Sequence, residues 1–156
     1  MIQRIQTIYL MLATLVAILA FFFPIAWFYG TLHTIEFFVY DVVDHVKDNL
    51  PVLKTVALLP SIIIAALLIL LPLYLIFQYK KLAQQLYWIN LVIFLALVQI
   101  ALQFFFYIPT ITKAVSAEPT YSYGVFSPLL IIVFLLFARN GIRKDIRLLK
   151  SVDRIR

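Results

Sequence analysis

The sequence predicts an all-α integral membrane protein in which four transmembrane helices form a single domain over residues 1–156. Two observations predict this fold class: 65% of the side chains are apolar and only 13% are charged, and the apolar residues gather in four long runs. An ordinary soluble domain is about 45–50% apolar and about 25% charged. A chain this short cannot bury so much apolar surface, so most of it must face lipid.

The four runs set the predicted spans at about 8–28, 56–79, 86–107 and 123–138. The first is read as a retained helix, because bulky aromatics continue where a signal sequence would have its small-residue cleavage site. Pro72, inside the second run, predicts a kink because proline lacks the backbone donor and crowds the preceding turn. Aromatic residues cluster at both ends of the runs, which is typical of membrane interfaces.

The charges predict the orientation of these spans. An even number of spans places both termini on one side, and that side carries ten cations against two acids. The opposite loops carry three cations against five acids. Because loops rich in Lys and Arg stay inside, we expect both termini and the turn at Lys80 and Lys81 to be cytoplasmic.

Two segments lie outside the predicted spans on the opposite side, the outer segment 30–55 and the outer loop 108–122. The outer segment has apolar residues at helical spacing and acids mainly on the other face, which favours a helix lying on the outer leaflet. The run from Phe37 to Tyr40 leaves a strand as the alternative. Pro109 is expected to close the third span, and the two outer segments are expected to pack together.

The cytoplasmic tail 139–156 is predicted to form a basic amphipathic helix, separated from the fourth span by Asn140 and Gly141. Anionic lipid of the inner leaflet is the favoured partner, a membrane or membrane-associated protein the second, and nucleic acid the least favoured. The candidate contacts for lipid or a partner are cationic residues of the turn and the tail: Lys80, Lys81, Arg139, Arg143, Lys144, Arg147, Lys150 and Arg154.

Inside the spans the candidate polar contacts are Asn90, Gln99 and Gln103. Gln99 and Gln103 lie four residues apart, so they share a helix face, and hydrogen bonds between helices are the favoured role. Contact with a substrate is the alternative. No Asp, Glu, Lys, Arg or His falls within 8–28, 56–79, 86–107 or 125–138. This argues against a proton- or ion-coupled carrier, which keeps an ionisable group in the membrane.

Enzyme chemistry has few candidates in this sequence. There is no cysteine, which excludes catalytic thiols, disulfides and thiolate metal sites. The outer segment alone gathers acids and histidines, namely His33, Glu36, Asp41, Asp44 and His45. A solvated acidic face is favoured over a metal site there, since no ligand motif is present. We therefore expect no catalytic residue, no metal and no cofactor.

Three stretches carry a resemblance to a known family: the start Met1–Leu10, the turn Phe77–Leu82, and the tail from Ala138 to Arg156. Together they resemble the membrane family called domain of unknown function 4293, found in Bacteroidota. The resemblance implies four spans, a basic cytoplasmic tail and a place in the bacterial inner membrane. It implies no activity, and it points to five tail residues as a recognition element: Arg143, Lys144, Asp145, Asp153 and Arg154.

The leading functional hypothesis is a non-catalytic accessory or scaffold subunit that binds a larger membrane-associated assembly through its bundle faces and basic tail. One alternative is a passive transporter or channel subunit, with a polar path at Asn90, Gln99 and Gln103. A second alternative is a membrane enzyme using the outer histidines and acids. The three differ in whether those polar residues converge.

Overall fold

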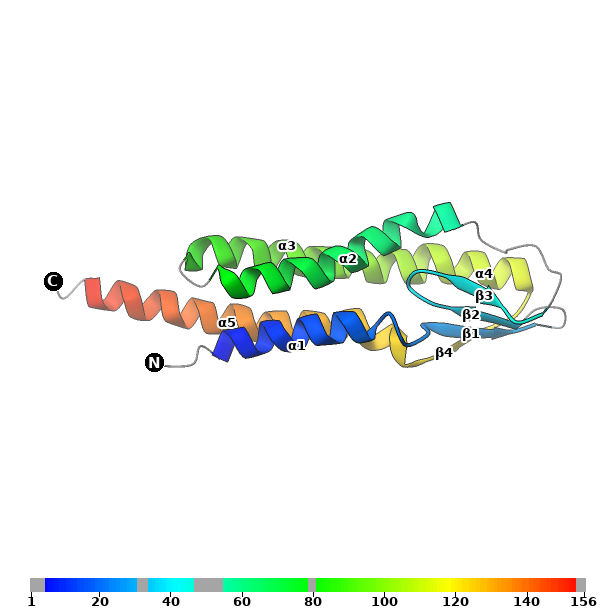
Figure 1. Cartoon of the computed structure of the whole chain (residues 1–156), viewed down its shortest axis with the longest axis horizontal. Helices are drawn as coiled ribbons and strands as arrows, with labels where there is room; N and C mark the ends of the chain where they lie inside the picture. The colour runs from blue at the N-terminus through cyan, green and yellow to red at the C-terminus, as the bar shows by residue number, and fades with distance from the viewer. Residues whose placement is uncertain (1–4, 31–33, 47–54, 79–80, 154–156) are drawn as a thin grey trace.

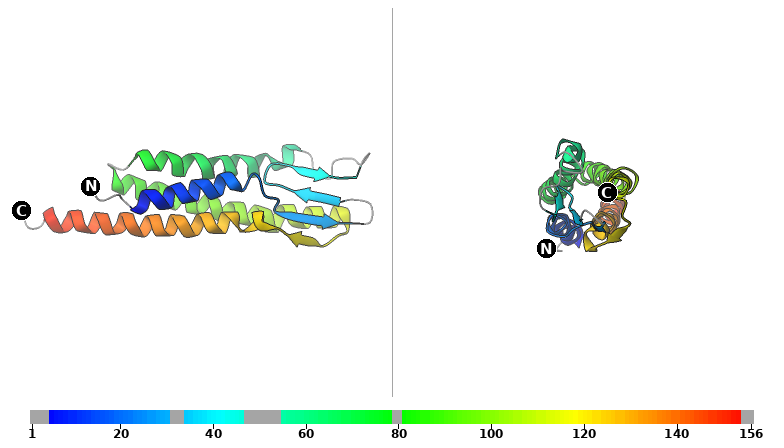
Figure 2. Two further views of the ribbon diagram at one scale, coloured as in Figure 1. Left: turned by 60° about the horizontal axis from the view of Figure 1, so that its bottom comes forward. Right: turned by 90° about the vertical axis from the view of Figure 1, so that its right-hand side faces the viewer.

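The computed structural model describes residues 5–30, 34–46, 55–78 and 81–153, with the side chains of 55 and 149–153 left out of the description. Its helices run side by side around one long axis (Figure 1), and the end-on view shows them surrounding a common core (Figure 2). One helix is interrupted in its middle by a wider π-helical stretch, η1. The helical elements are α1 (Ile5–Leu19), α2 (Thr55–Phe77), α3 (Leu82–Ala101), η1 (Leu102–Tyr107), α4 (Ile108–Val115), a 3-10 turn η2 (Tyr123–Phe126) and α5 (Ser127–Asp153).

Three helical stretches are long and apolar enough to cross a membrane: Val56–Phe77, Leu82–Val115 and Tyr123–Leu148. The helix α1 is also apolar but has 15 residues, which is about 22 Å at 1.5 Å per residue. α1 ends at Leu19 and is followed by tighter turns, in which the Phe21 and Phe22 amides donate to the carbonyls three residues earlier. Pro24 then disfavours helical backbone at Phe23, so the helix does not resume there. The structure therefore supports a multi-pass membrane protein, with a first helix shorter than the predicted span 8–28.

A four-stranded antiparallel sheet lies at the end of the bundle away from the two chain ends (Figure 1). Its spatial order is β3-β2-β1-β4, so β3 and β4 are the edges. The pairing joins Phe28 of β1 to Ile35 of β2 on one side and to Pro119 of β4 on the other. The strands are β1 (Ala26–Tyr29), β2 (Thr34–Phe37), β3 (Val42–Asp44) and β4 (Pro119–Tyr121).

Two apolar cores follow each other along the molecule. In the helical half, Leu10 of α1, Ile89 of α3 and Leu135 of α5 are fully buried among the four long helices. In the sheet half, one face of the sheet packs on α2, η1 and α4, and Phe37 lies with its ring centroid 5.9 Å from that of Tyr107. The sheet thus occupies the place that α1 and α5 occupy in the other half (Figure 2).

The outer segment forms strands where the structure describes it, so the favoured surface helix was wrong there. Ile35, Phe37 and Val39 are buried while the residues between them are more exposed, which is the period of two of a half-buried strand. The helical spacing seen in the sequence was a coincidence of the many β-branched residues, which favour strands. The expected packing of the two outer segments is confirmed, because Ile35 and Phe37 of β2 belong to the same buried cluster as Ile111 of α4.

The third span was predicted to end at Pro109. It instead continues through η1 and α4 to Val115. Pro109 is the second residue of α4, directly after the π-helical stretch. The π-helical turns shift the backbone hydrogen bonds just before Pro109. A proline at the start of a helical segment costs little stability, because the N–H that it lacks is not needed at that position. The helix ends at Ser116, which adopts the left-handed conformation with a φ of 54°.

The basic tail is not a separate helix, because α5 runs without a break from Ser127 to Asp153. Gly141 does not stop α5; an added Cβ there would lie 3.4 Å from the Cβ of Gln6, an ordinary packing distance, so α1 and α5 lie side by side at this position. Ile142, in the next position, is fully buried. The end of α5 therefore projects along the bundle axis beyond the other helices (Figure 1).

Candidate functional site

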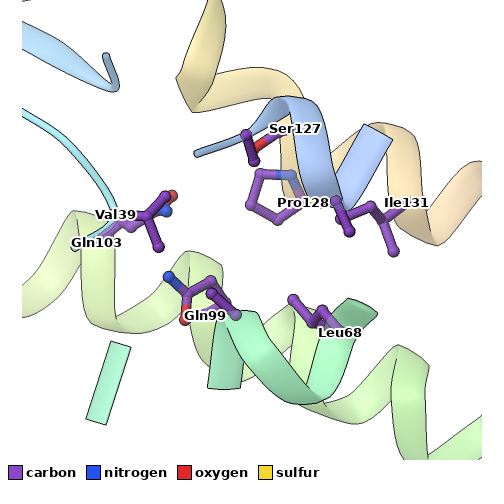
Figure 3. Close-up of a pocket in the computed structure, with 10 residues that line it drawn as sticks. Val39, Leu68, Gln99, Gln103, Ser127, Pro128 and Ile131 are labelled. Atoms are coloured by element: carbon purple, nitrogen blue, oxygen red, sulfur yellow. The ribbon is translucent and has the colours of Figure 1, made fainter. Parts of the chain in front are cut away.

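A small cavity with a mostly apolar wall and two glutamines lies between the helical half and the sheet half (Figure 3). Its wall contains alanines from α1 and α2, and Gln99 and Gln103 face Ser127, Pro128 and Ile131 of α5 across it. The cavity is small, with room of about 10 Å³ for the centre of a water-sized sphere. The lining residues are Ala17, Ala20, Val39, Ala65, Leu68, Gln99, Gln103, Ser127, Pro128 and Ile131.

A chain of buried hydrogen bonds connects the cavity to the sheet half. The Nε2 of Gln99 donates to the Oγ of Ser61 at 2.8 Å, and the Ser61 hydroxyl donates to the Val39 carbonyl at 3.1 Å. Since the only hydroxyl proton of Ser61 is used on Val39, Ser61 can only accept from Gln99. This fixes the orientation of the Gln99 amide and leaves its Oε1 as a free acceptor.

Gln103 is the unusual member of the site. Its side chain is fully buried, and neither atom of its amide has a hydrogen-bond partner among the described residues. It is the second residue of η1, and π-helical turns within α-helices are frequent at functional sites. A buried amide without partners costs free energy, so Gln103 marks a place where a further hydrogen-bonding group fits.

Asn90 does not join the other two predicted intramembrane polar residues. It is exposed on α3, whereas Gln99 and Gln103 line the cavity. Nine residues separate Asn90 from Gln99, which is two and a half turns at about 3.6 residues per turn, so they point in opposite directions. The structure therefore brings together two of the three residues.

The described cationic residues of the tail lie in the last part of α5, beside Ile142 and Ile146, which pack on the helical core. Arg143, Lys144 and Arg147 are exposed there, while Arg139 is half-buried with its Nε lacking a partner in the described part of the chain. Lys81, in the turn before α3, is exposed. Lys80 and Arg154 lie outside the described residues, and Lys150 belongs to α5 but its side chain is not described.

The outer histidine and acid group meets only in part. The Nε2 of His45 lies 3.1 Å from the Oε2 of Glu36, and the His45 ring stacks on that of Trp27 with centroids 5.7 Å apart. Asp41 and Asp44 accept bonds from the backbone amides of Val42 and Val46, as turn residues do. His33 lies outside the described residues, and those that are described contain no cluster of three potential metal ligands.

Sequence reasoning did not single out several buried polar residues. Ser61 connects Gln99 to the sheet half, and Gln6 and Gln85 are buried near the other end of the bundle. Gln85 donates to the Leu75 carbonyl at 2.9 Å, whereas neither amide atom of Gln6 has a partner among the described residues. The available signal was the stripe on α3 that repeats every three or four residues and contains Gln85, Gln99 and Gln103.

Comparisons with known proteins agree with the resemblance seen in the sequence. Neither a curated protein nor a solved structure matches the chain significantly. A family model described as Domain of unknown function (DUF4293) matches residues 2–155, which is almost the whole chain, so the protein belongs to this family.

Proposed function

We propose that the protein crosses the bacterial inner membrane four times, with the sheet outside and both termini in the cytoplasm. The sheet supports this placement, because its edge strands β3 and β4 have backbone groups that the sheet does not pair, and open sheet edges do not occur in hydrocarbon. The excess of cations beyond the opposite end supports the orientation.

The exposed aromatics support the same placement. Tyr87 and Phe105 are 68% and 85% exposed on the continuous helix formed by α3 and η1. They are 18 residues apart, which is about 27 Å along a helix and close to the about 30 Å thickness of a hydrocarbon core. Aromatic rings favour both interfaces of a membrane, so Tyr87 and Phe105 would mark the two borders of the hydrocarbon core. In this placement α1, the first helix of the chain, is the one remaining span, and the turn that follows it completes the crossing.

Within this placement, the function that the geometry supports best is a non-catalytic accessory or scaffold subunit. One observation carries the proposal: the last part of α5 presents Arg143, Lys144 and Arg147 to solvent, while Ile142 and Ile146 of the same stretch pack on the helical core. An exposed basic face at this end of the bundle suits an acidic surface of a membrane-associated protein. Anionic lipid of the inner leaflet would hold the cations nearest the membrane, such as Arg139 and Lys81, at about 1 kcal/mol each.

The test is affinity purification of the chromosomally tagged protein in mild detergent, with bound chains identified and counted by mass spectrometry. A stoichiometric partner is expected with the native chain and is expected to be lost when Arg143, Lys144 and Arg147 are replaced by Gln. The matched control is Lys113→Gln, which removes an exposed cation from α4 at the opposite end. Absence of any partner, or equal recovery with the triple variant, would contradict the proposal.

A passive transporter or channel subunit is the second candidate, favoured by the shared cavity of Gln99 and Gln103. It is the weaker proposal, because Asn90 lies on the opposite face of α3. The room of about 10 Å³ for a water-sized sphere also suits a single small molecule rather than a path. Flux of small neutral solutes into liposomes would separate it from the accessory subunit.

A further inference from the structure

The cavity between the two halves has the properties of a binding site for one small molecule. Its polar surface comes from Gln99 and Gln103 and its remaining wall is mostly apolar. The unpartnered groups facing it are the Oε1 of Gln99 and the whole amide of Gln103. A molecule that satisfies them must both donate and accept hydrogen bonds.

Charge and size narrow the ligand further. The cavity lining contains no ionisable residue, so a charged ligand would have no counter-charge there. The room for the centre of a water-sized sphere is about 10 Å³, close to the least that one water molecule needs. A buried water also needs two to four polar partners, which the free atoms of Gln99 and Gln103 can supply.

We propose that Gln99 and Gln103 hold one ordered water molecule in this cavity, at the joint between the helical half and the sheet half. The water accepts a hydrogen bond from the Gln103 amide and donates one to Gln99, extending the chain that runs through Ser61 to Val39. The inference does not depend on the proposed role as a subunit, because it concerns only this cavity.

The test is proton-detected solid-state NMR on the full protein, labelled with ¹⁵N-glutamine and reconstituted in liposomes. Magnetisation transferred from water to the side-chain amide of Gln103 would report a bound water. The Gln103→Met variant, which is similar in length and lacks the amide, assigns the signal. We expect a water cross-peak to Gln103 in the native chain.

Two variants that fill the cavity while keeping both glutamines make the test specific. Ala65→Val and Ala17→Val each add methyl groups to the wall, from α2 and α1 respectively. The Gln103 amide signal should remain in whichever variant folds, while its water cross-peak falls to the noise. A native chain without the cross-peak would overturn the proposal, and so would an unchanged cross-peak in a folded filled variant. A cross-peak that is present in Na⁺ buffer but lost when choline replaces Na⁺ would also overturn it, because the signal would then depend on the ion.

Discussion

The helical half and the sheet half of this chain differ in how they pair their backbone hydrogen-bonding groups. In the helical half, backbone groups bond mainly within their own helix, and many outward side chains are large and apolar, such as Met11, Phe94 and Leu129. In the sheet half, strands pair with each other and leave open edges, which do not occur in hydrocarbon. In the proposed placement, one chain therefore has a core surrounded by lipid directly followed by a core that faces water.

The largest expected difference between the two halves concerns their cores. Phe37→Ala should cost about 3–5 kcal/mol, because the loss of this fully buried ring would leave a cavity under the sheet, which faces water in the proposed placement. Leu135→Ala in the helical half should cost less than the about 2–5 kcal/mol typical of soluble cores. Its apolar surface would meet lipid tails even in separated helices, so little hydrophobic driving force is lost.

Unfolding of both variants by denaturing detergent in bicelles would measure these free energies. Proteolysis of the sheet gives a second readout, since Phe37→Ala should open β1 and β2 while the helices stay assembled. Equal losses for Phe37→Ala and Leu135→Ala would show that both cores lie in the same solvent.

The next largest effect on stability concerns two glycines, Gly124 at the joint between the halves and Gly141 in α5. At Gly124 a Cβ would lie 2.4 Å from the Pro24 carbonyl oxygen and 2.6 Å from that of Phe23, both backbone atoms that cannot move freely. Gly124→Ala should therefore cost about 1–3 kcal/mol through overpacking at the joint. The control is Gly141→Ala in α5, where the nearest contact is 3.4 Å and a helix gains up to about 1 kcal/mol from alanine. Similar thermal stability for the two variants would argue against the tight joint.

A smaller effect tests the polar link between the halves. Ser61→Ala removes the hydroxyl that donates to Val39 and accepts from Gln99, and should cost about 1–3 kcal/mol because both partners are left buried. Thr14→Val is the control: the Thr14 hydroxyl bonds only the Leu10 carbonyl one turn back, so its loss should cost little. Hydrogen exchange at the amides around Val39 should rise in the first variant alone.

The smallest expected effect is at the exposed face of the sheet. Glu36→Gln removes the carboxylate opposite His45; the side chains of His45 and Glu36 are 48% and 15% exposed. The glutamine oxygen can still accept from the His45 ring, and such surface contacts contribute about 0–1 kcal/mol, so the sheet should keep its protease resistance at ordinary salt. Clear opening of the sheet in this variant would give the pair a structural role that the geometry does not predict.

Composition and periodicity predicted the helices well, because a long apolar run is a strong signal for a helix that crosses a membrane. The stripe with Gln99 and Gln103 on a shared face is confirmed by the common cavity. The sheet was harder to predict, since its strands have three or four residues and β1 begins inside the predicted first span. Pairing of β4 with β1 joins residues more than ninety positions apart, which no local pattern encodes. The π-helical stretch around Gln103 likewise depends on tertiary packing.

The most direct test of the account asks whether the two ends of the molecule lie on opposite sides of the membrane. The chain has no cysteine, so single variants can be labelled with an impermeant maleimide without a background. Tyr29→Cys on the sheet and Lys144→Cys on α5 both replace exposed residues. We expect intact spheroplasts to label Tyr29→Cys at once and Lys144→Cys only after permeabilisation. Labelling of both from the same side would contradict it.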